Sequence, residues 1–346
     1  MSTIASRIRI NASIIDDAIR DNRSFAVAIM PGEDNPHIFG LLTDDKIDNS
    51  EVSFEIIPWL GQYEKRCIFH KYGIQNIESL GLAESMPRES TRKVDYLHSV
   101  DSVIERCRIR KGKTVISRVI CNEFKKDGLT IGEIAVKYFE AFPQTFRYIL
   151  YTPKSGGWIA ATPETLVDIN MNNGEISTMA FAGTRKAGSR NDWDEKNRAE
   201  NAFVLNYISE KLYNLGLKPE ISAWESVRFG EIEHLCYHIQ AKATSINIAE
   251  IVDALNPTPA LCGVPSSAAI ADIKTMESHP RGCYGGVVAF AQNGNYHAYV
   301  NLRCMQFTAQ GFCIYGGGGI TENSIPQIEF DETEAKTEFL QNLVNQ

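Results

Sequence analysis

Short runs of alternating hydrophobic and polar residues occur in pairs, and each pair is separated by an Asn-Gly dipeptide. Asn-Gly is preferred in the two-residue turns of β-hairpins, so the pattern predicts antiparallel strands. The paired runs are 166–170 with 176–181, around Asn173-Gly174, and 287–290 with 296–303, around Asn293-Gly294. A third hairpin is predicted between the strand at 296–303 and residues 312–315. Antiparallel sheet should therefore dominate the middle and the end of the chain.

Two longer segments show helical spacing instead. Residues 194–215 place hydrophobic side chains three and four positions apart, and Gly216 follows as a C-terminal stop. Residues 327–343 place Ile328, Ala335, Phe339 and Leu343 on one stripe. Strands and helices mix without regular βαβ alternation, and no linker divides the chain. We therefore expect an α+β fold in one large domain over residues 1–346.

Composition limits the partners. The formal net charge is -8 without a basic stripe, which argues against nucleic acid. No apolar run approaches the roughly 18 residues of a membrane span, and the start has no apolar segment typical of a secretory signal, so a cytoplasmic protein is expected. Eight cysteines form no CxxC pair, which predicts reduced, mostly buried thiols rather than a zinc site.

Two glutamates lie among hydrophobic positions of the predicted helices. Glu200 precedes Phe203 and Val204 by three and four residues, and Glu332 precedes Lys336 by four. A solvated Glu–Lys pair is the simpler interpretation of the second motif. If both carboxylates face inward, they need a proton or a cation, and oxygen ligands would suit Mg²⁺.

Other polar residues have simple structural interpretations beside functional ones. Lys113 begins a strand-like run and would be a solvated strand end, or, if buried, a general base. His234 is interpreted as a hydrogen-bonded structural histidine, and Arg303 as a surface residue or a carboxylate ligand. The glycine run at 315–320 is either a flexible turn or a place of close backbone approach to an anion.

Eight motifs between Lys113 and Lys336 resemble, in order, the chorismate-utilising enzymes. They are FAGTRKAG (181–188), KNRAEN (196–201), EHLCYHIQAK (233–242), NPTPALCG (256–263), RGCYGG (281–286), VNLRC (300–304), YGGGGI (315–320) and DETEAK (331–336). The resemblance implies one domain of two packed antiparallel sheets with helices outside. Residues 110–346 carry the motifs, and residues 1–100 are less similar to the family.

The resemblance also implies a site. Glu200 and Glu332 would hold Mg²⁺, which binds the ring carboxylate of chorismate. Lys336, Arg303 and Gly317 would surround the substrate carboxylates or the metal, and Tyr284 would line the pocket. Asn201 is a departure, because relatives often have histidine there.

Branches of the family differ in nucleophile and product. Aminodeoxychorismate synthases have a nucleophilic lysine where this chain has Ala182, and salicylate synthases have threonine where it has Ala260. Anthranilate synthases use ammonia and lack a lysine matching Lys113. The chain therefore resembles isochorismate synthases, of menaquinone or siderophore type, with salicylate synthase or anthranilate synthase component I as alternatives. A non-catalytic binding relative would have no use for both Lys113 and Glu164.

The implied mechanism adds water at ring carbon 2. Lys113 would deprotonate that water, and Glu164, kept protonated by burial, would protonate the departing 4-hydroxyl. His234 would lie near the ring and assist contact with the leaving group. The resemblance implies a monomer without a glutaminase subunit and without an organic cofactor.

Overall fold

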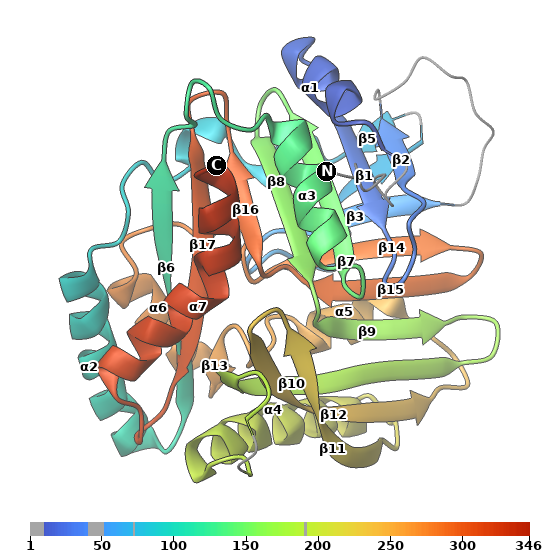
Figure 1. Ribbon diagram of the computed structural model, residues 1–346. Coiled ribbons are helices and arrows are strands. Elements are labelled where there is room, and N and C mark those ends of the chain that lie inside the picture. The colour runs from blue at the N-terminus through green and yellow to red at the C-terminus, as the bar shows by residue number, and fades with distance from the viewer. Residues whose placement is uncertain (1–9, 41–51, 72, 190–191) are drawn as a thin grey trace.

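Two antiparallel β-sheets pack face to face in the computed structural model, with helices on the outside (Figure 1). The structure describes residues 10–40, 52–71, 73–189 and 192–346. The prediction that the start of the chain is no secretory signal concerns residues that lie mostly outside these ranges. The predicted α+β fold is confirmed.

The first sheet has eight strands. In spatial order they are β13 (Gly263–Val264), β6 (Lys113–Asn122), β17 (Phe312–Ile320), β16 (Cys304–Phe307), β8 (Gly156–Thr162), β7 (Phe146–Thr152), β1 (Phe25–Ile29) and β2 (His37–Gly40). The second sheet has nine strands, namely β11 (Glu220–Phe229), β12 (Ile232–Lys242), β10 (Glu175–Lys186), β9 (Thr165–Asn170), β15 (Asn295–Val300), β14 (Val287–Gln292), β3 (Ser53–Ile57), β4 (Cys67–His70) and β5 (Gly73–Gln75).

Aromatic side chains fill the space between the sheets. Phe146 of β7 stacks on Tyr299 of β15 with ring centroids 4.4 Å apart, and Tyr148 of β7 lies 5.2 Å from Phe54 of β3. The helices are α1 (Ala12–Arg20), α2 (Lys93–Arg110), α3 (Ile131–Ala141), α4 (Glu195–Asn214), α5 (Ile248–Leu255), α6 (Ser266–Met276) and α7 (Pro326–Val344). Helix α4 packs on β10 and α7 on β17, so each sheet carries one of the two helices that supply glutamates.

The first two predicted hairpins are confirmed, and the third is wrong. β9 pairs with β10 and β14 with β15, but β15 ends at Val300 and the chain then crosses to the other sheet. There β16, not β15, pairs with β17. The hydrophobic pattern continues through residues 301–303, so the sequence does not reveal the change of sheet. Arg303 turns the chain at this crossover with φ 52°.

Both long helices occur where they are predicted, but the buried face of α7 differs. Gly216 follows α4 with φ 77°, as its position as a stop requires. On α7, Ile328 and Phe339 are exposed, and Ala335 is exposed as well. The helix instead buries Glu329, Thr333 and Thr337 against β17. Near its C-terminal end it also buries Leu340, Leu343 and Val344. The glycines of β17 leave room for these polar side chains, so the predicted stripe is right at Leu343 and wrong at Ile328, Ala335 and Phe339.

The prediction of reduced cysteines is wrong for one pair. Cys121 and Cys313 are directly opposite on adjacent strands β6 and β17, with Cα atoms 4.1 Å apart, and they form a disulfide. Close cross-strand pairing brings the two sulfur atoms together, which the 192-residue separation in sequence conceals. The six other cysteines are free and buried, as predicted.

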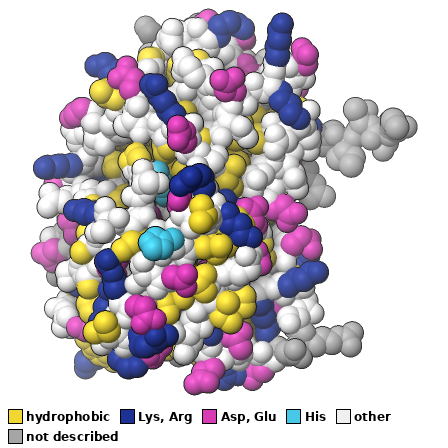
Figure 2. All heavy atoms as spheres, turned by 90° about the vertical axis from the view of Figure 1, so that its left-hand side faces the viewer, with side chains coloured by type: hydrophobic (Ala, Val, Ile, Leu, Met, Phe, Trp, Pro, Cys, Tyr) yellow, Lys and Arg dark blue, Asp and Glu magenta, His cyan; other side chains and the backbone are white. Residues whose placement is uncertain are grey.

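Figure 2 shows the face that lies on the left-hand side of Figure 1. On this face, acidic and basic side chains are interspersed among hydrophobic ones. Among the described residues, no helix has the length and apolar character needed to cross a bilayer.

Candidate active site

A single pocket between the two sheets collects most of the predicted site residues. All six predicted substrate-binding residues line it, together with Glu164 and Glu200. The lining comprises Val115, Glu164, Phe181, Ala182, Gly183, Thr184, Glu200, His234, Ala260, Leu261, Tyr284, Leu302, Arg303, Tyr315, Gly316, Gly317, Gly319 and Lys336. Lys113 and Glu332 lie behind this surface and contact it through Glu200 and Lys336.

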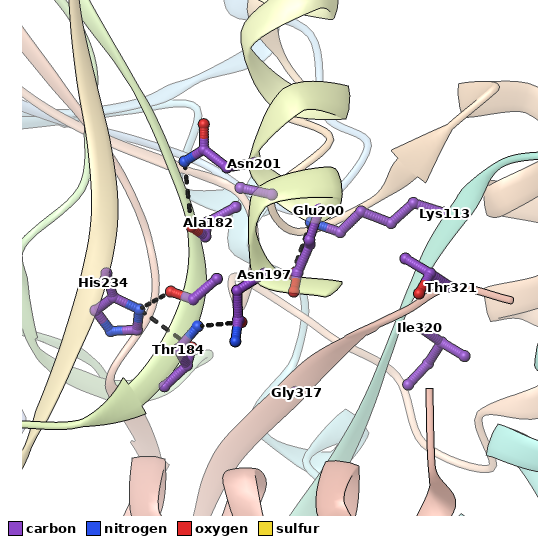
Figure 3. A network of polar contacts seen from close by, with 12 residues as sticks. Lys113, Ala182, Thr184, Asn197, Glu200, Asn201, His234, Gly317, Ile320 and Thr321 are labelled. Atoms are coloured by element: carbon purple, nitrogen blue, oxygen red, sulfur yellow. Dashed lines mark hydrogen bonds and ion pairs between the residues drawn. The ribbon is translucent and has the colours of Figure 1, made fainter. Parts of the chain in front are cut away.

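Lys113 is fully buried at the start of β6. Its Nζ lies 3.0 Å from Oε1 of Glu200 (Figure 3). Gly319 of β17 makes this pair possible, because a Cβ at that position would lie 2.1 Å from Glu200 Oε1 and 2.6 Å from Lys113 Cε. The glycine run is thus neither a flexible turn nor a loop but a strand without side chains. It lets charged groups from opposite sides approach each other.

Asn201 fixes the part of α4 that carries Glu200. Its amide nitrogen donates hydrogen bonds to the carbonyl oxygens of Ala180, Ala182 and Leu235, at 3.1, 3.1 and 2.8 Å. These carbonyls belong to β10 and β12, so the side chain attaches the helix to the sheet. The residue that departs from the family pattern is therefore fully buried and held by the sheet, next to Glu200 in the chain.

Three glutamates gather where α4 meets α7, and sequence reasoning missed one of them. Glu329 is 1% exposed and faces the same cluster as Glu200 and Glu332. Its spacing of three residues before Glu332 was the available signal. Lys196, four residues before Glu200, was also missed. Its Nζ lies within 3.1–3.9 Å of an oxygen of each glutamate.

One oxygen of this carboxylate cluster is unsatisfied. Oε2 of Glu200 and Oε1 of Glu329 are buried and lie 3.4 and 3.1 Å from the ammonium group of Lys196, and Oε2 of Glu329 is buried without a hydrogen-bond partner among the described residues. The pKa of Glu329 is raised to about 7, mainly by burial and also by the charges of Glu332 and Glu200, while Lys196 acts in the opposite direction. Burial alone would also raise the pKa of Glu200, but the ammonium groups of Lys113, Lys196 and Lys336 hold it well below its usual range. An anionic oxygen set with free lone pairs fits a hard divalent cation such as Mg²⁺.

Glu164 lies in the turn between β8 and β9 and is 3% exposed. Burial raises its pKa to about 8, although Lys113, Lys336 and Arg303 act in the opposite direction. The raised value is in the direction expected for a carboxylic acid that holds its proton at neutral pH.

Arg303 and His234 form a buried pair at the opposite wall. Arg303 donates from Nη1 to the carbonyl oxygen of Lys336 at 3.0 Å, and its Nη2 lies 2.9 Å from Nε2 of His234. Nδ1 of His234 lies 3.1 Å from the carbonyl oxygen of Gly183 and 3.2 Å from Oγ1 of Thr184 (Figure 3). Burial and the charges of Arg303 and Lys336 hold the pKa of His234 well below its ordinary value. Arg303 is thus a buried residue that faces the pocket.

Lys336 and Tyr284 adjoin the glycine strand. Lys336 Nζ donates to the carbonyl oxygen of Gly317 at 2.9 Å and to Oε1 of Glu332 at 2.5 Å, so the Glu–Lys pair is largely withdrawn from solvent, with side chains 10% and 18% exposed. Tyr284 stacks on Tyr315, and its hydroxyl would lie 2.7 Å from a Cβ at position 317. The pocket therefore joins cationic donors on one side to a carboxylate cluster on the other.

Arginine and lysine side chains beside buried carboxylates are groups that could bind an anionic substrate and a divalent cation. Residues 62–345 match the family described as "Chorismate binding enzyme". Since this match covers most of the sequence, the chain belongs to the chorismate-binding enzyme family, as the motifs predict.

Relatives with different names share this family. The chain is 26% identical over 245 residues to isochorismate synthase EntC of Escherichia coli (strain K12), a match that covers 67% of this chain and 62% of EntC. It is 29% identical over 199 residues to anthranilate synthase component 1 1 of Halobacterium salinarum, covering 51% and 37% of the two chains. The matched stretch thus spans less than two thirds of the length of these curated relatives.

The fold extends over more of the chain than the sequence match does. A crystal structure described as a putative 2,3-dihydroxybenzoate-specific isochorismate synthase, DhbC from Bacillus anthracis, superposes with a TM-score of 0.75. This similarity covers 95% of this chain and 99% of that chain at 19% sequence identity. At such identity the likeness shows the fold.

Proposed function

We propose that this protein is an isochorismate synthase, which converts chorismate to isochorismate in a Mg²⁺-dependent reaction. The observation that carries the proposal is that Ala182 and Ala260 line the same pocket as the buried acid Glu164. By the family resemblance, a lysine at the first position would attack the ring itself, and a threonine at the second would favour loss of pyruvate. With neither present, water is the nucleophile that this pocket favours.

The binding roles follow from charge. Arg303 and Lys336 are the cations that face the pocket, so they would bind the carboxylates of chorismate, with Gly317 and Tyr284 beside them. Glu200, Glu329 and Glu332 would hold Mg²⁺, which supplies orientation and charge stabilisation at the ring carboxylate. Ala260 belongs to the wall next to Leu261, whose carbonyl oxygen accepts a hydrogen bond from Arg281 at 2.6 Å.

The proton transfers are assigned to two buried residues. Lys113 would have to give up its ammonium proton before the step, and its neutral amine would then accept a proton from the water that forms the new bond to ring carbon 2. Glu164 donates its proton to the oxygen at ring carbon 4, which leaves as water while the ring double bonds shift. One water enters and one leaves, so the reaction is an isomerisation. The Glu164 pKa of about 8 keeps that acid protonated at neutral pH.

Product identification tests the assignment. Purified protein is incubated with chorismate and Mg²⁺, and the products are separated by chromatography, with isochorismate expected. Salicylate as the main product would assign the protein to the salicylate synthases. A second incubation with ammonium salts tests for fluorescent anthranilate, because anthranilate synthase component I is the other alternative. Because water is the proposed nucleophile, ammonium should not change the product. We also propose that the protein acts as a monomer without a glutaminase subunit.

A further inference from the structure

Lys196 contacts all three glutamates of the carboxylate cluster. Its Nζ lies 3.1 Å from Oε1 of Glu329, 3.4 Å from Oε2 of Glu200 and 3.9 Å from Oε2 of Glu332. Within the described ranges, no other lysine reaches more than one of these carboxylates, since Lys113 pairs with Glu200 and Lys336 with Glu332. Lys196 therefore lies at the common centre of the cluster.

The cluster holds its own counter-charges, because each glutamate pairs with a lysine. Three glutamates face three lysines, and the two helices that carry the glutamates meet at Lys196. A divalent cation among the same oxygens would add two positive charges next to an ammonium group. Mg²⁺ also needs its ligand oxygens at about 2.0–2.1 Å, so the carboxylates must turn from the lysine toward the ion. The ammonium group and the metal ion thus compete for one set of oxygens.

Of the three lysines, Lys196 is the one that can move away. Lys113 is fully buried inside β6, and Lys336 is held by the carbonyl oxygen of Gly317. In the part of the chain that the structure describes, no backbone carbonyl accepts a hydrogen bond from Lys196, so the contacts of its ammonium group are with the carboxylates. It lies in the first turn of α4, where an ammonium group gains nothing from the helix dipole.

We propose that Lys196 is the resident counter-ion of this cluster and that a divalent metal ion binds by displacing its ammonium group toward solvent. The lysine thereby lowers the affinity for the metal and holds the glutamates in place while no metal is bound. This inference rests on the metal site in the proposed function. It makes Lys196 a positioning residue for the metal site, separate from the groups that handle the substrate.

Metal binding without substrate provides the first test. The metal-stripped full chain is titrated with Mn²⁺ and the free ion is followed by electron paramagnetic resonance, for wild type, Lys196→Met and Lys211→Met. Lys211 is the matched control, because it lies on the same helix about 22 Å further along the axis and removes the same charge. We expect Lys196→Met to bind Mn²⁺ at least tenfold more tightly and Lys211→Met to stay within twofold of wild type.

Glu225, Cys236 and His238 form a second group that could take up Mn²⁺, since their ligand atoms lie within 4.8 Å of one another. The titrations are therefore repeated with His238→Ala in each background, and the effect of Lys196 should persist. Unchanged or weaker binding by Lys196→Met overturns the inference while leaving the metal site intact. If none of the proteins binds Mn²⁺, both the inference and the metal site are overturned. Chorismate turnover is measured separately, because it tests the proposed function.

A second test uses the wild-type protein, so it does not depend on the folding of a variant. Lysines are acetylated briefly with a water-soluble ester, with and without Mg²⁺, and modification is measured by mass spectrometry. Displacement of the ammonium group predicts at least threefold faster modification of Lys196 when Mg²⁺ is bound, with Lys211 unchanged. Equal modification of Lys196 in both conditions contradicts displacement.

Discussion

Arg303 donates a hydrogen bond to His234, with Nη2 and Nε2 2.9 Å apart. A guanidinium group can only donate, so Nε2 of the imidazole must be the acceptor. The proton then resides on Nδ1, which faces the carbonyl oxygen of Gly183. His234 is therefore a neutral ring of fixed tautomer, and its main effect is to orient the guanidinium group in the pocket.

The tautomer can be observed directly. We expect ¹⁵N NMR of the His234 ring to show a protonated Nδ1 that does not titrate between pH 5 and 8, because burial and Arg303 keep its pKa well below the ordinary value. His238 is half-exposed and serves as an internal reference. Protonation of His234 within this range would contradict the assignment.

The pH dependence of turnover should reflect Glu164. An acid must be protonated to donate, so the rate should fall as pH rises through the Glu164 pKa of about 8. Glu164→Gln keeps the shape of the side chain without the acidic proton and should lower kcat by ~10² or more. Rate profiles of wild type and Glu164→Asp test the assignment, because an alkaline limb unmoved by the aspartate would assign it to another group.

Removal of Lys113 should affect chemistry more than binding. Lys113→Met should lower kcat by ~10² or more, the usual scale of acid–base assistance, while Arg303 and Lys336 still bind the substrate. Lys111→Met is the control, because Lys111 lies two residues earlier and pairs with Glu322 at the surface. Turnover and chorismate affinity are measured for both variants, and near-normal turnover of Lys113→Met would exclude Lys113 as the base.

Removal of the metal ion by a chelator should abolish activity without unfolding the protein. EDTA should abolish turnover and added Mg²⁺ should restore it, while the thermal unfolding temperature changes little, because lysines already neutralise the glutamates. Glu200→Gln should weaken the response to Mg²⁺. Full activity after exhaustive chelation would refute the metal site.

A side chain added to the glycines of β17 should disturb the carboxylate cluster. Gly319→Ala places a methyl group 2.1 Å from Glu200 Oε1, so a side chain or the strand must move. Overpacking of this kind costs roughly 1–3 kcal/mol, and loss of Mg²⁺-dependent turnover should accompany it. A Cβ at Gly73 has no atom within 4 Å, which makes Gly73→Ala the control. Chemical denaturation and turnover of both variants provide the measurement.

The sequence predicts where the helices and strands lie better than it predicts which of their faces are buried. Asn-Gly turns have a local cause, so the two hairpins around Gly174 and Gly294 could be placed from sequence. The buried face of α7 depends on a strand without side chains elsewhere in the chain. A hydrophobic stripe cannot report that, because the buried residues Glu329, Thr333 and Thr337 are polar.

The site was predictable where a motif marked it. Glu200 and Glu332 stood out by position, and the structure brings both to one cluster. Nothing in the sequence except helical spacing indicates that Glu329 and Lys196 belong to the site, and many surface residues have the same spacing. Arg303 looked like a strand residue, because the change of sheet at 301–303 arises from tertiary packing and leaves no signal in the local pattern.

The crossover at Arg303 couples the architecture to recognition. This residue ends the passage from one sheet to the other, and its guanidinium group faces the pocket. Its carbonyl oxygen accepts a hydrogen bond from the hydroxyl of Tyr138 on α3 at 2.8 Å. A displacement of one sheet against the other would therefore also move this guanidinium group, which we propose binds a substrate carboxylate. Substitutions in the aromatic layer between the sheets, such as at Phe146, should therefore change the affinity for the ligand even where the protein remains folded.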